Sequence, residues 1–130
     1  MQDASVALPE SRWTLTEPVG YLEFLALQSQ ARLVLTDSGG VQEETTALGV
    51  PCITLRENTE RPCTVSEGTN QIAGTSRAGI LSAFEAAMNR GPRVGGFARM
   101  PALWDGRAAD RVADTLDRLF RESRPLEVCA

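Results

Sequence analysis

A serine, two glycines and the acidic side chains that follow them form the first group in this sequence that could do chemistry. The stretch 36–44, TDSGGVQEE, comes directly after the apolar run RLVL and leads into a helical pattern. The first turn of a helix has unpaired N–H groups and the positive end of the helix dipole, and both attract an anion. Because Gly39 and Gly40 lack a Cβ, a phosphate could approach the backbone closely, and Ser38 could cap the helix or donate to that phosphate.

Glu44 extends this group along the helix. It lies four residues after Gly40, on the same helix face and about 6 Å further along the axis. This distance fits the span from a phosphate to the hydroxyls of an attached ribose, which carboxylates commonly bind in nucleotide sites. A structural use stays open, because acids near a helix start also suit the dipole. A Ser-Gly-Gly turn alone is more often a tight strand-to-helix connection.

A second polar cluster, RENTERP at 56–62, follows the neighbouring apolar run CITL. Because parallel strands end at the same edge of a sheet, we expect Arg56, Thr59 and Arg61 to lie beside the Ser-Gly-Gly turn. Two arginines at an anion-binding helix start would hold a diphosphate through paired N–H groups. The alternative is a solvated loop in which the Arg and Glu side chains pair with each other.

Alternating strand and helix patterns predict the elements that position these two clusters. Expected strands cover 13–18, 32–36, 51–56 and 70–74. Expected helices cover 18–31, 38–49, 62–68, 75–91 and 105–123. Such alternation predicts an α/β fold, a partial Rossmann-like domain of about four parallel strands with helices on both faces. Ser38 is the expected N-cap of the second helix and Gly49 its expected C-terminal glycine.

The length and composition set limits on the function. At 130 residues the chain is long enough for one domain, and its net charge of −4 argues against a nucleic-acid partner. The sequence has no His, which excludes a Ser-His-Asp triad and a His-ligated metal. Cys52, Cys63 and Cys129 have no metal-ligand spacing, and we expect reduced thiols. With no signal peptide and no apolar run near about 20 residues, we expect a cytoplasmic protein without a membrane partner.

The two clusters, with EGTN and DGRAADRV further along, resemble the non-hydrolysing UDP-N-acetylglucosamine 2-epimerases over about residues 16–120. The resemblance implies a GT-B fold of two Rossmann-like domains with the active site in the cleft between them. It also implies interconversion of UDP-GlcNAc and UDP-ManNAc, by elimination and re-addition of UDP, without a dinucleotide or metal cofactor. The expected organisation is an irregular segment 1–12, a partial UDP-binding domain 13–122 and a tail 123–130.

The resemblance also assigns roles to individual residues. It implies eight substrate-binding residues: Ser38, Gly39, Gly40, Glu43, Glu44, Arg56, Thr59 and Arg61. Among them, the Ser-Gly-Gly turn contacts the diphosphate, Glu44 accepts from the ribose hydroxyls, and Arg61 faces the substrate side of the cleft. No catalytic residue is assigned, because the family's N-terminal domain with its catalytic carboxylates has no counterpart in this sequence.

The sequence departs from the family pattern at two points, and several functions stay open. Cys63 stands where the family usually has Glu, and PALWDG replaces NPYGDG, so that Trp104 takes the place of a glycine. The first hypothesis is the C-terminal nucleotide-binding portion of an epimerase, inactive without the N-terminal domain. The alternatives are a non-catalytic UDP-sugar-binding module or subunit of a split GT-B enzyme, and a remnant that binds nothing. We expect UDP or a UDP-N-acetylhexosamine as ligand, and a homodimer or an N-terminal domain partner covering exposed apolar surface.

Overall fold

The computed structural model describes residues 12–89 and 100–122 and is an α/β fold built on a parallel sheet. The strands are β1 (Val34–Thr36), β2 (Cys52–Thr54) and β3 (Asn70–Ile72), in the order β1-β2-β3. Val34 pairs with Cys52, and Cys52 pairs with Asn70, so all three strands begin at the same edge of the sheet. The predicted fold class is confirmed, with three strands rather than about four.

The strand expected at 13–18 is wrong. This segment is extended but pairs with no strand in the described part of the chain, and Trp13 and Leu15 are exposed. A strand is stable only when a neighbouring strand completes its hydrogen bonds. Alternation of apolar and polar residues, as in 13–18, does not show whether such a neighbour exists.

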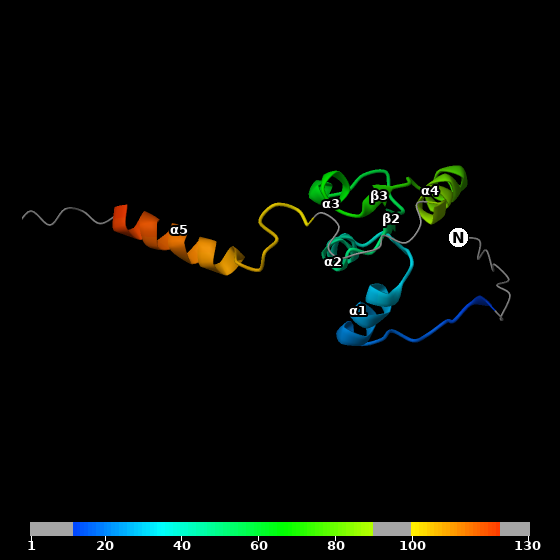
Figure 1. Cartoon of the computed structure of the whole chain (residues 1–130), viewed down its shortest axis with the longest axis horizontal. Helices are drawn as coiled ribbons and strands as arrows, with labels where there is room; N and C mark the ends of the chain where they lie inside the picture. The colour runs from blue at the N-terminus through cyan, green and yellow to red at the C-terminus, as the bar shows by residue number, and fades with distance from the viewer. Residues whose placement is uncertain (1–11, 90–99, 123–130) are drawn as a thin grey trace, which may run out of the picture.

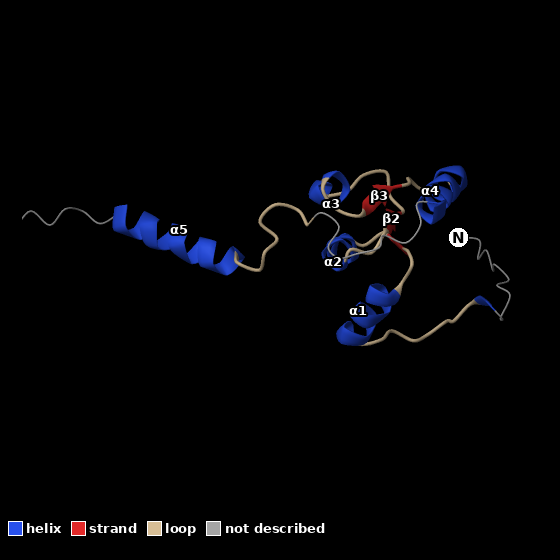
Figure 2. Cartoon of the chain, in the orientation of Figure 1, coloured by secondary structure: helices blue, strands red, loops and turns tan. Residues whose placement is uncertain are grey.

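Within the described residues, five helices of at least one full turn surround or follow the sheet, as expected, with shorter bounds. They are α1 (Tyr21–Gln30), α2 (Gly39–Leu48), α3 (Pro62–Ser66), α4 (Arg77–Asn89) and α5 (Ala108–Glu122). The strands lie between α2 and α3 on one side and α4 on the other (Figure 2). Ser38 is the extended N-cap of α2, and Gly49 ends that helix with a left-handed φ of 71°, so both cap assignments are confirmed.

The buried centre of the fold is unusually polar. Its buried apolar side chains are Val50, Cys52, Ile53 and Ala83. The buried polar ones are Gln28, Gln42, Thr45, Thr46, Thr54, Thr64 and Asn70. Because buried polar groups require hydrogen-bond partners, the packing of α2 and α3 on the sheet depends on specific pairs rather than on apolar contact alone.

The last helix, α5, stands away from the sheet (Figure 1). None of its side chains is buried, and Val112, Leu116 and Phe120 of its apolar stripe are 59%, 49% and 70% exposed. Among the described helices, none is long and apolar enough to span a membrane. The segments expected at the two ends, 1–12 and 123–130, lie almost wholly outside the described residues.

Candidate functional site

The Ser-Gly-Gly turn lies at the carboxyl end of β1, where the chain enters α2. The Ser38 N–H donates to Thr36 Oγ1 at 3.0 Å, and the Ser38 carbonyl accepts the Gln42 N–H at 3.3 Å. The Ser38 side chain makes no capping hydrogen bond, so Ser38 caps α2 through its backbone alone. The first-turn N–H groups of α2 therefore have no partner from this hydroxyl and are oriented toward the end of the helix.

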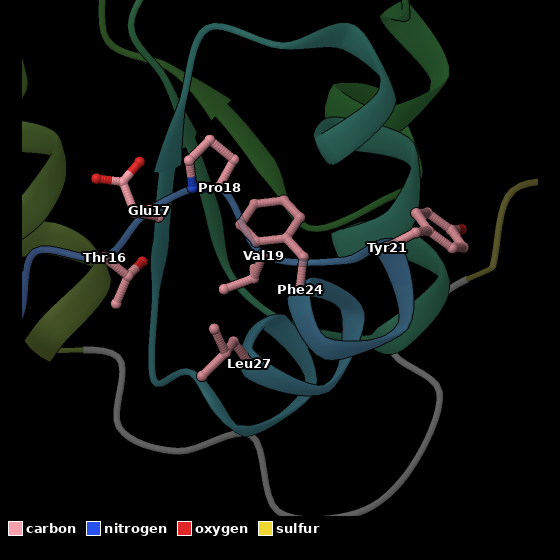
Figure 3. A pocket seen from close by; sticks show the side chains of 7 residues that line it. All are labelled: Thr16, Glu17, Pro18, Val19, Tyr21, Phe24 and Leu27. Carbon is pink, nitrogen blue, oxygen red and sulfur yellow. The ribbon is translucent and has the colours of Figure 1, made fainter.

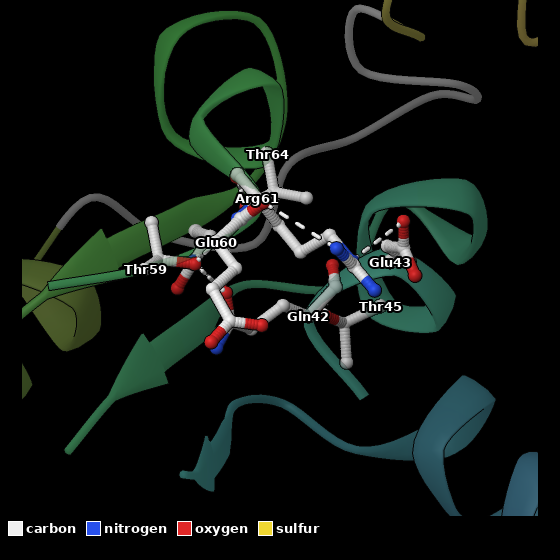
Figure 4. Close-up of polar contacts among 8 residues, drawn as sticks. Gln42, Glu43, Thr45, Thr59, Glu60, Arg61 and Thr64 are labelled. Atoms are coloured by element: carbon white, nitrogen blue, oxygen red, sulfur yellow. Dashed lines mark hydrogen bonds and ion pairs between the residues drawn. The ribbon is translucent and has the colours of Figure 1, made fainter. Parts of the chain in front are cut away.

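Arg61 lies directly over this turn. A Cβ built on Gly39 would lie 3.9 Å from Arg61 Cγ and 4.0 Å from its Nε. The same Nε is 3.0 Å from Glu43 Oε1, and the two side chains are 42% and 41% exposed (Figure 4). The Nε–H is not aligned for a hydrogen bond, so this contact is an ion pair. The structure thus brings Gly39, Glu43 and Arg61 together, as the sequence predicts, and it shows an Arg–Glu pair at the same point.

A buried amide on α2 anchors the loop that carries Arg61. Gln42 is 0% exposed, and its Oε1 accepts from Thr59 Oγ1 at 2.6 Å and from Asn70 Nδ2 at 3.2 Å. Thr59 Oγ1 also accepts the Arg61 N–H at 2.9 Å. Figure 4 shows Gln42 on α2 facing Thr59 and Arg61 on the loop before α3. Thr59 is therefore beside Arg61, as predicted, but its contacts are to the protein.

Asn70, the first residue of β3, completes the buried polar cluster. Its Oδ1 accepts from Thr54 Oγ1 at 2.7 Å, and its Nδ2 donates to Thr64 Oγ1 at 3.1 Å. Thr64 Oγ1 in turn donates to the Arg61 carbonyl at 2.7 Å. Sequence reasoning assigned no role to Gln42, Thr54, Thr64 or Asn70. A signal was present, since Gln42, Thr45 and Thr46 give α2 a polar stripe at the i, i+3, i+4 spacing where an apolar one is usual.

Glu44 points to a different neighbour from Glu43. Its Oε2 accepts from Gln28 Nε2 of α1 at 2.6 Å, and Gln28 is 3% exposed. A carboxylate has about four acceptor positions, so this bond orients Glu44 and leaves acceptor capacity for a ligand. The two adjacent acids thus diverge, Glu43 toward Arg61 and Glu44 toward α1. The ribose contact of Glu44 stays a prediction.

Arg56 is not joined to the site by any bond within residues 12–89 and 100–122. Its carbonyl accepts the Gly74 N–H at 3.1 Å. The next residue, Glu57, accepts from the Thr75 hydroxyl at 2.8 Å and from the Thr75 N–H at 3.0 Å, and these bonds lower the pKa of the Glu57 carboxyl. The first half of the RENTERP loop is therefore attached to the start of α4, and only the second half, from Thr59 to Arg61, faces the Ser-Gly-Gly turn.

The cysteines and acids of the described chain form no further reactive centre. Burial raises the pKa of the Cys52 thiol, which outweighs the opposite effect of its hydrogen bond with Thr45. Such a thiol is a poor nucleophile. Residues 12–89 and 100–122 hold no group of three or more His, Cys, Asp or Glu that could ligate a metal.

A groove of about 600 Å³ lies elsewhere, between the extended N-terminal segment and α1 (Figure 3). Its lining residues are Thr16, Glu17, Pro18, Val19, Tyr21, Phe24 and Leu27. The lining is mostly apolar, with Glu17 as its single charged side chain, and includes no residue of the Ser-Gly-Gly turn. The groove therefore does not overlap the candidate site, which is defined by the polar groups that converge at the Ser-Gly-Gly turn.

Comparison with known proteins gives a consistent set of similarities. Residues 2–117 match the family described as UDP-N-acetylglucosamine 2-epimerase. The UDP-N-acetylglucosamine 2-epimerase of Methanocaldococcus jannaschii is 57% identical over 76 residues, 58% of this chain and 21% of the relative. That of Escherichia coli is 36% identical over 103 residues, 78% of this chain and 27% of the relative.

Solved structures agree with the sequence comparison. The crystal structure of the M. jannaschii enzyme in complex with UDP-GlcNAc and UDP matches with a TM-score of 0.66 and 45% identity. The match covers 79% of this chain and 27% of the other. The chain thus spans about a quarter of the length of the relatives that it matches, and its α/β architecture corresponds to part of their GT-B fold.

Proposed function

The chain belongs to the UDP-N-acetylglucosamine 2-epimerase family, and from that membership we propose that it supplies the diphosphate- and ribose-binding part of such an isomerase. The ligand would be UDP or a UDP-N-acetylhexosamine. A solved relative of 45% identity contains UDP-GlcNAc and UDP, which supports this ligand class.

The observation that carries the proposal is the position of Arg61 over Gly39, at the N-terminus of α2. A diphosphate at this point would accept the free N–H groups of the first helical turn and face the positive end of the helix dipole. The guanidinium of Arg61 would add paired donors to the phosphate oxygens. Glu44 lies further along the same helix and is oriented by the hydrogen bond that it accepts from Gln28, and its carboxylate would accept from the ribose hydroxyls.

A diphosphate at this point would compete with Glu43 for the guanidinium of Arg61. The ion pair is about two-fifths exposed, and exposed pairs contribute only about 0–1 kcal/mol. A diphosphate carries more negative charge than the Glu43 carboxylate and would accept from the helix N-terminus as well as from the guanidinium, so exchange of partner would be favourable. In an elimination reaction UDP leaves as an anion, and the same helix terminus and arginine would stabilise the charge that develops on it.

The proposed contribution of this chain is binding and leaving-group stabilisation. Moving a proton from and to C2 of the sugar requires positioned acid and base groups, and the family's catalytic carboxylates have no counterpart among these 130 residues. We propose that a second domain or a partner chain supplies these groups. The 130-residue chain on its own should therefore bind UDP without interconverting UDP-GlcNAc and UDP-ManNAc.

Titration calorimetry with UDP tests the proposal on the parent chain and three variants. Arg61→Ala should weaken binding by about 10- to 100-fold, because hydrogen bonds to charged groups contribute about 1.5–3 kcal/mol. Glu44→Ala should weaken it by about 10-fold, through loss of the ribose contact. Arg77→Ala, on α4 away from the turn, is the charge-matched control and should bind like the parent. No heat of binding with the parent would end the proposal.

A further inference from the structure

The single proton of the Thr59 hydroxyl is committed to a protein partner. Gln42 Oε1 can only accept, so at 2.6 Å the Thr59 hydroxyl must be the donor in that bond. The same oxygen accepts the Arg61 N–H at 2.9 Å. Thr59 has no second proton to give, and an anion such as a diphosphate accepts hydrogen bonds rather than donating them. Thr59 could therefore not donate to a diphosphate without breaking its bond to Gln42.

The bond to Gln42 is one link in a closed ring of hydrogen bonds that begins and ends on the backbone of Arg61. The Arg61 carbonyl accepts from Thr64, and Thr64 Oγ1 accepts from Asn70 Nδ2. The other Nδ2 proton of Asn70 goes to Gln42 Oε1, which also accepts from Thr59. Thr59 then accepts the Arg61 N–H, which closes the ring.

The direction of every bond in this ring follows from its starting point. A carbonyl oxygen only accepts, so Thr64 must donate to Arg61 and can only accept from Asn70. Asn70 must then donate to Thr64 through its NH2 group, and Gln42 must accept the other NH2 proton with its Oε1. This order fixes both amide orientations and the Thr59 hydroxyl. Gln42, Thr64 and Asn70 are buried, where a lost bond costs more than at the surface.

We propose that Gln42 and Thr59 are positioning residues, which hold the backbone of Arg61 so that its guanidinium reaches the diphosphate, and that neither touches the ligand. The inference rests on the proposed UDP site and changes the role expected for Thr59 from contact to support. The ring acts on the backbone of Arg61, whereas Glu43 acts on its side chain. The loop thus stays in place when Arg61 exchanges Glu43 for a phosphate.

The test uses variants of the full chain that differ by single groups. Thr59→Val keeps the side-chain shape and removes the hydroxyl, while Thr59→Ser keeps the hydroxyl. In calorimetry with UDP, Thr59→Val should weaken binding about 10-fold and Thr59→Ser less than about 3-fold, the scale of one lost hydrogen bond. Gln42→Met, of similar volume but without the acceptor, should weaken binding at least as much as Thr59→Val.

A double variant with Arg61→Ala shows whether Thr59 acts through Arg61 or contacts the ligand itself. Because the ring uses only the backbone of Arg61, the alanine variant retains it. If Thr59 acts through Arg61, Thr59→Val should cause less than about a 2-fold further loss of UDP affinity in that background, a non-additive pair. An additional loss of about 10-fold would show direct contact with the ligand and overturn the proposal.

Amide hydrogen exchange without ligand separates failure of this inference from failure of the UDP site. Thr59→Val should speed exchange of the Arg61 amide about 10-fold or more and leave the amides of α4 unchanged. If the Arg61 amide of Thr59→Val exchanged as slowly as in the parent, the proposed support of Arg61 by the ring would be wrong. Absence of UDP binding by the parent, with the expected exchange result, would instead refute the proposed function and with it the ligand part of this inference.

Discussion

Two helices of this molecule differ in the side chains that they bury: α2 buries polar side chains, and α5 leaves an apolar stripe exposed. The α2 helix presents a polar inner face, with Gln42, Thr45 and Thr46 at 0% exposure, and the helix contacts the sheet and α3. Among the described helices, α5 has the most regular apolar stripe, yet none of its side chains is buried. An apolar stripe alone therefore does not determine burial, because a helix also needs a partner surface within the same chain.

The difference has a functional consequence. The polar interior under α2 fixes one arrangement of the loop that carries Arg61, since Gln42 Oε1 accepts from both Thr59 and Asn70. The exposed stripe of α5 and the groove beside α1 are surfaces of a kind that normally contacts another protein surface. For these surfaces we propose either a second domain like that of the longer relatives, or a second copy of the chain. The region around α2 should therefore stay folded without a partner, whereas α5 and the groove beside α1 should need one to bury their apolar side chains.

The largest effect should come from truncating the sheet core. Ile53, at the centre of β2, is 0% exposed, so Ile53→Ala should lower the free energy of unfolding by about 2–5 kcal/mol. Leu116→Ala on α5 is the matched truncation and should change it by less than about 0.5 kcal/mol. Urea denaturation of both variants measures the contrast. Equal losses would mean that α5 is packed as firmly as the sheet.

Substitution of Gly68, compared with that of Gly106, should give the next largest change in the free energy of unfolding. A Cβ on Gly68 would lie 2.5 Å from the Thr64 carbonyl oxygen and 2.6 Å from Thr46 Cγ2, so Gly68→Ala must displace backbone or buried side chains. We expect a loss of about 1–3 kcal/mol in the free energy of unfolding. Gly106, before α5, has open space around its Cβ position but a φ of 77°.

Gly106→Ala therefore serves as the contrasting variant. Its cost is conformational and falls on a segment outside the sheet core, so the denaturation midpoint should shift less than in Gly68→Ala. A larger shift for Gly106→Ala would contradict the separation of the two regions. Circular dichroism of α5 would then show whether the helix unfolds together with the sheet.

Surface substitutions on α5 should affect association more than stability. Leu116 and Phe120 are 49% and 70% exposed, so Leu116→Glu and Phe120→Glu should change the free energy of unfolding by less than about 0.5 kcal/mol. If a second copy covers this face, both changes should shift the chain toward monomer in sedimentation velocity. A parent that stays monomeric at micromolar concentration would exclude the homodimer.

The smallest effects concern pH, with one exposed carboxylate in each region. Hydrogen bonds from Thr75 lower the pKa of the Glu57 carboxyl, and the Arg111 guanidinium lowers that of Asp105. A lowered folded-state pKa stabilises the fold at pH values above the unfolded-state pKa, and this stabilisation is lost as pH falls through the folded-state value. The loss should begin below about pH 4.5 for Glu57 and below about pH 3.8 for Asp105.

Carbon-13 chemical shifts of the two carboxyl groups would follow these titrations. Thr75→Val should bring the pKa of Glu57 back toward its ordinary value and leave Asp105 unaffected. Likewise, Arg111→Gln should raise the pKa of Asp105 alone. Unchanged midpoints in both variants would show that these hydrogen bonds do not persist in solution.

Much of the fold followed from local signals in the sequence. Ser38 and Gly49 marked the ends of α2 because caps depend on short-range backbone geometry. The placement of Arg61 beside Gly39 followed from parallel strands ending at one edge. The strand expected at 13–18 failed because pairing depends on a partner strand that alternation cannot reveal.

The polar interior could not be predicted from the sequence in the same way. The partners of Gln42 come from residues 17 and 28 positions away, and only the folded chain brings Thr59 and Asn70 to it. The bond from Gln28 to Glu44 is likewise set by how α1 packs on α2. Long polar side chains find their partners through tertiary packing, so their types and spacing predict a polar face but not its bonds.

The most direct test of the central claim is a two-dimensional NMR titration of the labelled chain with UDP. We expect the amide resonances of Gly39, Gly40 and Arg61 to shift most on addition of UDP, while those of Val19 and Phe24 in the groove stay in place. Shifts confined to the groove, or no shifts at UDP concentrations in the millimolar range, would contradict the assignment of the Ser-Gly-Gly turn as the diphosphate site.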